Sequence, residues 1–176
     1  RRGALMDRNA CAGVSLVELL VTIAVLGILV STAIASPVAM NQHLELESGL
    51  RLLRIGLDRG RMAAERNQQP CALSLSPIGW DAPLAGELPA CRGGRLDLNE
   101  QGASALTLRS NLPDAVRFTA NGLVLDGGLV VLSHPQRTQA LCLVIGLPLG
   151  ITRTGTYLGD VDRPLSSSQC TPRDAR

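Results

Sequence analysis

The chain has no lysine and very few aromatic residues. Its 176 residues include one Trp, one Tyr and one Phe, so a core must be built from Leu, Val, Ile and Ala. All 17 basic residues are Arg and they stand against 15 acidic residues, which gives a formal net charge of +2. This balance excludes a strongly basic domain that attracts nucleic acid by bulk charge alone.

Motifs of the common catalytic sites are also missing. The sequence contains no HExxH, GxSxG, GxGxxG or CxxC pattern and no Walker A loop. Its two histidines, His43 and His134, lie far apart, and no pair of acidic residues has a spacing that favours acid–base chemistry. Trp80, the only tryptophan, is expected to be a core residue. We therefore expect a protein that is not an enzyme and that needs no metal or cofactor.

Five cysteines divide between the start of the chain and its later part. Cys11 lies near the start, whereas Cys71, Cys91, Cys142 and Cys170 lie downstream. Four cysteines permit three pairings, and the sequence does not choose among them, although short loops favour Cys71–Cys91 and Cys142–Cys170. Structural disulfides require an oxidising compartment such as the bacterial periplasm. Free thiols in a cytosolic protein are the alternative, which fits poorly with the apolar segment described next.

A long apolar run is the main feature that the sequence does contain. Between Val14 and Met40 the only charged residue is Glu18. The run is longer than the ~20 apolar residues that a spanning helix needs, so 14–40 is expected to be a transmembrane segment. Three arginines before it would keep the N-terminus in the cytoplasm and the rest of the chain outside. They are Arg1, Arg2 and Arg8.

Two simple interpretations of the run leave one residue unexplained. A single-pass anchor accounts for its length. A secretory signal peptide accounts for Ala33-Ile34-Ala35, which has the small-x-small pattern of a cleavage site. Neither accounts for Glu18, because a carboxylate within the hydrocarbon costs on the order of 3 kcal/mol.

A third interpretation gives this carboxylate a role. The stretch Gly13-Val14-Ser15-Leu16-Val17-Glu18 resembles the class III signal of type IV prepilins. The resemblance implies that prepilin peptidase cuts after Gly13, that 1–13 is a leader peptide, and that Val14 becomes the N-methylated first residue. Glu18 is then the fifth mature residue, which would pair with the N-terminal amine of a neighbouring subunit. Such a partner offsets the cost of desolvating the carboxylate, so processing and filament assembly would be linked.

The segment after the run is predicted to be an amphipathic helix. Apolar residues recur on one face from 41 to 67, and Pro70 should end the helix near Asn67. Pro37 should kink the helix, which would otherwise extend over 14–67 for roughly 80 Å. Three glycines should weaken it, each by ~1 kcal/mol relative to Ala. The apolar face consists of Leu46, Leu50, Leu53, Leu57 and Ala64, and the glycines are Gly49, Gly56 and Gly60.

Beyond Asn67 the sequence alternates in the manner of strands. Asn121-Gly122 is its strongest hairpin signal. The polar tail after Arg163 is expected to be ordered only if Cys170 attaches it to the rest. We therefore expect a β-rich periplasmic domain over 68–176 and an α+β fold, in which the long helix packs on an antiparallel sheet. The predicted strands include CALSLS, GRLDLN, ALTLRS, VRFTA, LVVLS and ALCLVIG.

Several stretches of this domain resemble the GspH/FimT family of minor pilins and pseudopilins. They are LRIGLDRGRMAAERNQQPCALSLSPIGW, VRFTANGLV and ALCLVIGLPLGITRTG. The resemblance implies a pilin-like fold and a low-abundance subunit at or near the tip of a type II secretion pseudopilus or a type IV pilus. Its partners would be other pilins through the N-terminal helix, prepilin peptidase, and the bacterial inner membrane.

A competing hypothesis concerns DNA. Some FimT-type members bind DNA during natural transformation and resemble one another in a Gly-Arg-x-Arg motif near the C-terminus. The matching stretch here is Gly150-Ile151-Thr152-Arg153, in which apolar Ile151 replaces the first Arg and does not neutralise a phosphate. Arg153 is a candidate phosphate contact, with Arg137 and Arg163 as additions to the same patch. The alternative is a solvated arginine at the end of a strand.

Overall fold

The residues that the computed structural model describes are 14–34, 37–83, 88–100 and 105–172. The predicted leader 1–13, including Gly13 and Cys11, lies outside them, as does Ala35 of the alternative cleavage pattern. Contacts divide the chain into two units, with the boundary after Met40. Each unit is therefore considered by itself.

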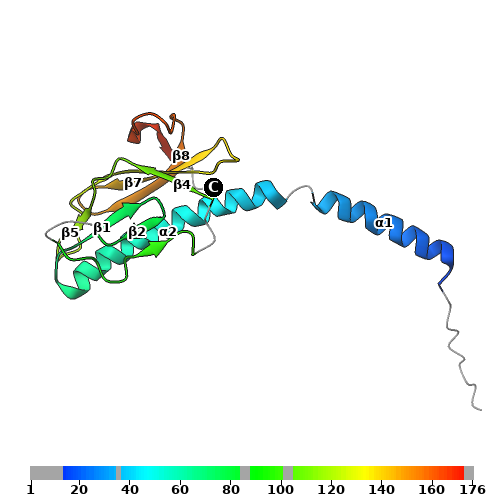
Figure 1. Cartoon of the computed structure of the whole chain (residues 1–176), viewed down its shortest axis with the longest axis horizontal. Coiled ribbons are helices and arrows are strands. Elements are labelled where there is room, and N and C mark those ends of the chain that lie inside the picture. Colours follow the sequence, from blue (N-terminus) through cyan, green and yellow to red (C-terminus); the bar gives the residue numbers. More distant parts are fainter. Residues whose placement is uncertain (1–13, 35–36, 84–87, 101–104, 173–176) are drawn as a thin grey trace, which may run out of the picture. The chain divides into compact units, whose positions relative to one another are not determined.

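Two helices precede the strands (Figure 1). They are α1, Leu16–Ile34, and α2, Pro37–Asn67. Pro37, expected to kink a continuous helix, is the first residue of α2, where its missing N–H breaks no helical hydrogen bond. Residues 35 and 36 lie outside the described part, so the uninterrupted helix over 14–67 stays a prediction.

The strands form two antiparallel sheets rather than the single sheet expected. The first has the order β3-β2-β1-β5, with bounds Leu96–Asp97, Gly79–Asp81, Cys71–Ser76 and Val116–Phe118. The second has the order β4-β6-β7-β8-β9, with bounds Thr107–Ser110, Gly128–Ser133, Ala140–Gly146, Ile151–Tyr157 and Cys170–Pro172. A short 3-10 helix, Ser167–Gln169, leads into β9. The fold class is therefore α+β, as the sequence predicted.

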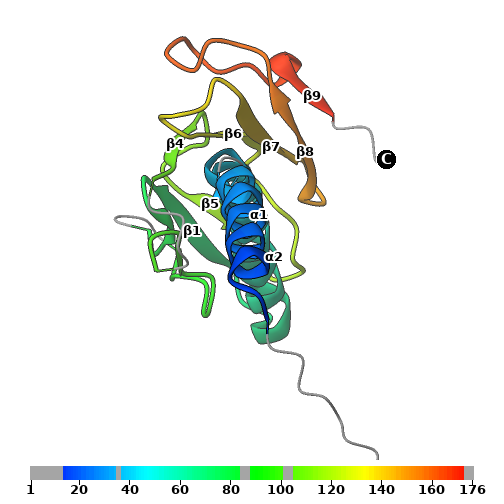
Figure 2. The same cartoon turned by 90° about the vertical axis from the view of Figure 1, so that its right-hand side faces the viewer.

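The apolar face of α2 forms the centre of the core. Its four leucines and Ala64 are buried, which confirms the predicted face. Figure 2 shows strands of both sheets around α2, and one buried cluster joins the helix to both. Trp80 of β2 is also buried, and its indole Nε1 donates a hydrogen bond to the Leu53 carbonyl oxygen at 2.7 Å. The predicted core position of Trp80 is therefore correct.

The glycines of α2 allow this close packing. A Cβ added at Gly56 would lie 2.2 Å from Cδ1 of Trp80, and one added at Gly60 would lie 2.5 Å from Cδ1 of Leu73. Both distances are shorter than any real carbon–carbon contact. The glycines therefore lower the helix propensity of α2 but allow its backbone to lie in close contact with the sheets.

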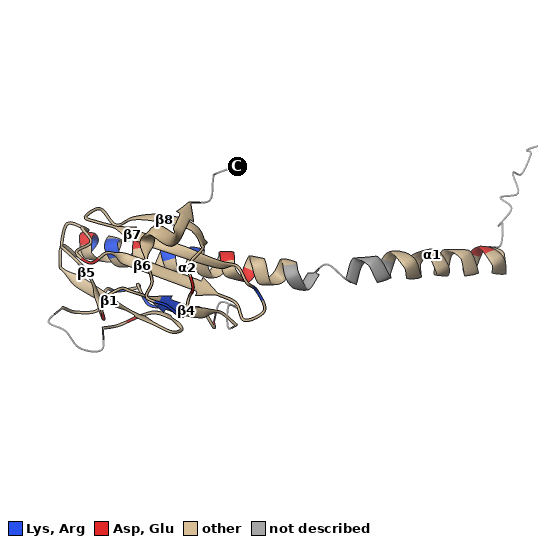
Figure 3. Cartoon of the chain, turned by 90° about the horizontal axis from the view of Figure 1, so that it is seen from above, with Lys and Arg blue, Asp and Glu red and all other residues tan. Residues whose placement is uncertain are grey.

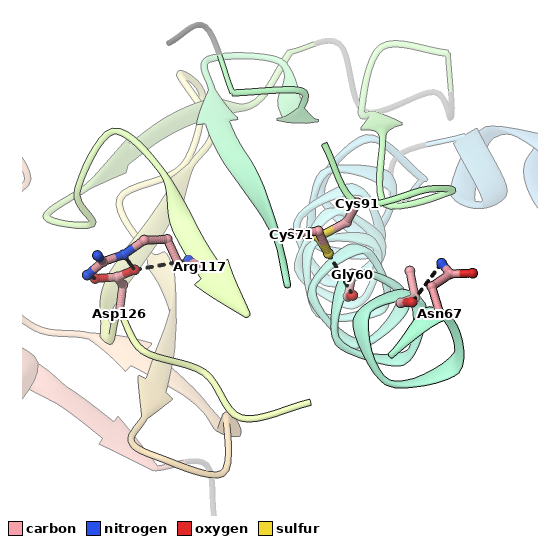
Figure 4. The surroundings of a disulfide bond; sticks show 7 residues. Gly60, Asn67, Cys71, Cys91, Arg117 and Asp126 are labelled. Carbon is pink, nitrogen blue, oxygen red and sulfur yellow. Dashed lines mark hydrogen bonds and ion pairs between the residues drawn. A yellow bond between two sulfur atoms is a disulfide. The ribbon is translucent and has the colours of Figure 1, made fainter. Parts of the chain in front are cut away.

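Two disulfides join distant parts of the second unit. Cys71 of β1 is bonded to Cys91, and its Sγ lies 3.8 Å from the Gly60 carbonyl oxygen of α2 (Figure 4). Cys142 of β7 is bonded to Cys170 of β9. These are the two pairings that loop length favours. The second bond ties the C-terminal segment to the sheet, where β9 pairs with β8.

The Asn121-Gly122 turn forms, but the hairpin around it is short. Gly122 has a φ of +73°, and a single antiparallel bridge joins Phe118 to Val124. Besides backbone hydrogen bonds, the returning segment is held by Asp126, whose two carboxylate oxygens accept hydrogen bonds from Nε and Nη2 of Arg117, both at 2.8 Å (Figure 4). The Arg117 backbone N–H donates to the same carboxylate at 2.9 Å. These hydrogen bonds lower the pKa of Asp126 and raise that of Arg117.

Candidate processing and assembly site

Ser15 fixes the beginning of α1. Its side-chain Oγ accepts a hydrogen bond from the Glu18 backbone N–H at 3.2 Å. Its carbonyl oxygen accepts one from the Leu19 N–H at 3.1 Å. Ser15 is therefore the N-cap, and Glu18 is the third helical residue. Ser-x-x-Glu is the spacing of a capping box, and a carboxylate in the first turn also interacts favourably with the helix dipole.

This local role of Glu18 was missed in the sequence analysis. The cost of a carboxylate in a membrane gives Glu18 no use in a plain anchor, whereas the capping spacing does. The spacing Ser15-Leu16-Val17-Glu18 was the signal that could have revealed the cap. Capping uses the backbone N–H of Glu18, however, and does not engage its carboxylate.

The Glu18 carboxylate is available to a partner. The side chain is exposed, and within the described residues its oxygens have no hydrogen bond or ion pair. It is the only acidic residue in the first turn of α1, where Figure 3 shows the acidic colour at the beginning of the helix. Val14, the predicted first mature residue, is exposed four positions earlier. Gly13, on the other side of the predicted cleavage bond, lies outside the described residues.

The rest of α1 presents apolar side chains in every direction. From Val14 to Leu29 each residue is exposed, and the large apolar side chains range from 50% exposed at Val25 to 77% at Leu16. The Thr22 hydroxyl donates a hydrogen bond to the Leu19 carbonyl oxygen at 2.9 Å, so this donor is satisfied within the helix. A helix that is apolar on all sides needs an apolar partner on all sides.

The transmembrane segment predicted at 14–40 is not found in the part of the chain that is described. No helix there combines the length and the apolar character that crossing a bilayer requires.

The three arginines considered for DNA binding do not come together. Arg153 lies on β8 opposite Val144, whereas Arg137 lies in the turn before β7, beyond the other end of the β7–β8 ladder. Arg163 pairs with Asp160, at 3.5 Å between Nε and Oδ2. Arg153 is exposed, and no described residue pairs with it. The predicted patch is thus reduced to one arginine.

The two histidines make only local structural contacts among the described residues. His134 is buried, and its Nδ1 accepts a hydrogen bond from the Gln136 N–H at 3.1 Å while its Nε2 lies 3.7 Å from Oε2 of Glu45. His43 lies 3.2 Å from Glu47, one helical turn further along α2. Among the described residues there is no group of His, Cys, Asp and Glu that could hold a metal ion.

Comparison with known proteins bears on the N-terminal segment. A family model described as the prokaryotic N-terminal methylation motif matches residues 8–34. No curated protein and no solved structure matches the chain. The matched segment contains Gly13, Val14, Glu18 and the whole of α1. This motif indicates a type IV pilin-like protein that is processed by prepilin peptidase, and it implies association with other pilins.

Proposed function

We propose that the chain is a minor pilin or pseudopilin of the GspH/FimT type. It is a low-abundance structural subunit at or near the tip of a type II secretion pseudopilus or a type IV pilus. Residues 14–40 anchor it in the bacterial inner membrane before assembly, and the β-rich domain from 68 onward lies in the periplasm. Two disulfides in that domain agree with an oxidising compartment.

The observation that carries this proposal is the surface of α1. The helix is apolar on all sides, yet it begins with an exposed carboxylate that no described residue engages. A membrane or a bundle of similar helices would cover the apolar side chains. Only the bundle also supplies a cation for Glu18, because cleavage before Val14 gives each neighbouring subunit a free α-amino group.

The pairing would make assembly depend on cleavage. The new amine of one subunit and the Glu18 carboxylate of the next lose their water together in the apolar interior. An isolated buried carboxylate would be strongly disfavoured, whereas a close ion pair offsets much of that cost. Before cleavage the nitrogen of Val14 is part of the peptide bond to Gly13 and carries no charge, so the uncleaved chain lacks this partner.

Mass spectrometry of the native chain tests the processing step. We expect a mature N-terminus at Val14 that carries one additional methyl group. A chain that begins at Ser36 would show a secretory signal peptide instead, and a chain that retains 1–13 would show that no prepilin peptidase acts on it.

Substitution of Glu18 tests the assembly step. Glu18→Gln keeps the size of the side chain and the Ser15 cap but removes the charge, so we expect normal cleavage and a loss of filament incorporation. Ser15→Ala is the matched control, because it removes the cap, worth about 1 kcal/mol, and keeps the charge. Incorporation measured in sheared filament fractions should be retained in that control. Equal incorporation of Glu18→Gln and the native chain would contradict the proposed pairing.

DNA binding is the second candidate function, and one observation favours it. Arg153 is exposed next to Gly150-Ile151-Thr152 and has no acidic partner among the described residues. We expect affinity for duplex DNA to fall as salt rises and to fall again in Arg153→Ala. Arg163→Ala is the control, since Arg163 is already paired with Asp160. A chain that fails to shift duplex DNA at low salt would end this alternative.

A further inference from the structure

We propose that a hollow beside the C-terminal half of α2 docks an acidic segment of another filament subunit. This inference rests on the proposed filament function. The hollow, called the basic hollow below, has a volume of about 350 Å³ and lies between α2 and the residues that follow Cys91. Its charged and apolar lining comes chiefly from Arg59, Met62, Arg66 and Arg92.

The charge of the basic hollow is uncompensated within the described part of the chain. Arg59, Arg66 and Arg92 are all exposed, and none of them has a hydrogen bond or ion pair there. Other arginines have carboxylate partners, as in Arg54–Asp58, Arg95–Asp81, Arg109–Asp162, Arg117–Asp126 and Arg163–Asp160. Asp97 and Glu100 line a second hollow that shares Arg59, but neither lines the basic hollow itself. Three arginines thus line one hollow, and none of its described lining residues is acidic.

The arginines stand on rigid elements. Arg59 and Arg66 are seven residues apart on α2, which places them on one face, about 10 Å apart along the axis. Arg92 follows Cys91, which is buried and bonded to Cys71, and Cys71 in turn contacts the Gly60 carbonyl oxygen on the same helix (Figure 4). A partner would therefore meet backbones that are already ordered, which lowers the entropic cost of binding.

The chemistry of the lining favours a polypeptide. Arg matches carboxylates with paired N–H donors, and Met62, 42% exposed, offers an apolar contact between the arginines. Arg and Met are both enriched in the cores of protein–protein interfaces. The complementary surface is a segment with at least two carboxylates and one apolar side chain.

Two other anionic partners fit less well. Nucleic acid is held by roughly 6–10 phosphate contacts in typical complexes, whereas the basic hollow offers three cations in a chain of net charge +2. Anionic lipid is distant along the chain, because Arg59 and Arg66 follow Met40 by 19 and 26 residues of α2, about 28 Å and about 39 Å. Lipid headgroups around a membrane segment that ends at Met40 would not reach either arginine.

Photo-crosslinking in the host tests the proposal on the full chain. A benzoylphenylalanine introduced at Met62 should form an adduct with another pilin-like subunit, and mass spectrometry should map that adduct to a segment with two or more carboxylates. Charge reversal in Arg59→Glu, Arg66→Glu and Arg92→Glu together should abolish the adduct. Reversal of Arg51, Arg153 and Arg163, which are exposed and do not line the hollow, changes the net charge equally and should leave the adduct in place. An adduct with lipid, with nucleic acid or with an uncharged segment would overturn the proposal, as would equal loss in both triple variants.

A binding measurement separates this proposal from the filament function. The purified full chain in detergent is titrated with a labelled Glu-Leu-Glu-Glu-Leu-Glu peptide, with its glutamine counterpart, and with a duplex oligonucleotide. We expect the acidic peptide alone to bind, with affinity reduced at least about tenfold by the basic-hollow variant and little by the control. Binding of the duplex rather than the peptide, or of neither, would refute the docking site even if cleavage at Gly13 and incorporation through Glu18 proceed as proposed. A chain that binds the peptide but is never cleaved would retain the site and lose the filament role.

Discussion

Substitution of Gly56 by alanine tests how closely α2 packs on the first sheet. On an isolated helix the change should stabilise by about 1 kcal/mol, because alanine has the higher helix propensity. In this protein the new methyl group would meet Cδ1 of Trp80 at 2.2 Å and Nε1 at 3.0 Å, so the buried ring must move. Overpacking costs about 1–3 kcal/mol, and the Trp80 hydrogen bond to Leu53 contributes about 1 kcal/mol more. We expect a net loss of about 2 kcal/mol.

The tryptophan itself reports the result. Trp80 is the only one in the chain, so its fluorescence follows the unfolding of the full chain by denaturant and any displacement of the ring. A loss of about 2 kcal/mol corresponds to a Tm lower by roughly 6 °C for a domain of this size. Gly49→Ala is the matched control, since its methyl group would meet only the ends of leucine side chains, Cδ1 of the half-buried Leu106 and Cδ2 of the buried Leu132. If Gly56→Ala raised the Tm and left the emission unchanged, the close contact between helix and ring would be wrong.

Further expected outcomes concern the disulfide and the ion pair of the second unit. Replacement of both Cys142 and Cys170 by serine opens a loop of sequence separation 28 and should destabilise the domain by about 3.5 kcal/mol, with proteolysis of the full chain then beginning at the C-terminal segment. Arg117 lowers the folded-state pKa of Asp126 below its value in the unfolded chain. The ion pair therefore contributes its full stability above the ordinary carboxyl pKa, near 3.9. That stability is lost as the pH falls through the lower folded-state pKa. Asp126→Asn should therefore destabilise the domain at pH 7 and reduce the decrease of its Tm at acidic pH. If the variant and the native chain lost Tm equally at acidic pH, the ion pair would not be the cause.

Local patterns in the sequence predicted the elements well. The apolar spacing along α2 identified its buried face, and Pro70 correctly placed its end at Asn67, where the side-chain amide donates to the Ala63 carbonyl oxygen. Alternation and apolar runs likewise located β1 and β7 with the bounds that the structure has. Each of these signals depends on residues a few positions apart, so the short-range periodicity of the sequence is sufficient to predict the element.

The pairing of strands that lie far apart in the sequence could not be predicted from local patterns. β1 pairs with β5 about 45 residues later, while β4 joins β6 in a different sheet, so no local pattern shows that there are two sheets. The glycines of α2 were predicted to weaken the helix because their cost is local, whereas their benefit lies in contacts with strands that follow.

The candidate sites likewise differ in whether they depend on a local motif or on contacts between distant segments. Val14 and Glu18 were proposed from a short linear motif, and their roles stay predictions; the Ser15 cap could have been recognised in the same motif. The basic hollow could not be predicted from the sequence. Arg66 and Arg92 are separated by a disulfide-closed loop, and the sequence does not specify the course of that loop.

The cap of α1 has a consequence for the leader. Both groups that fix the first turn, the hydroxyl of Ser15 and the amide of Glu18, lie downstream of the bond that the peptidase would break. Removal of the leader would therefore leave the helical turn intact and uncover a charged end two residues ahead of it. The mature subunit would emerge from proteolysis with its docking end already folded.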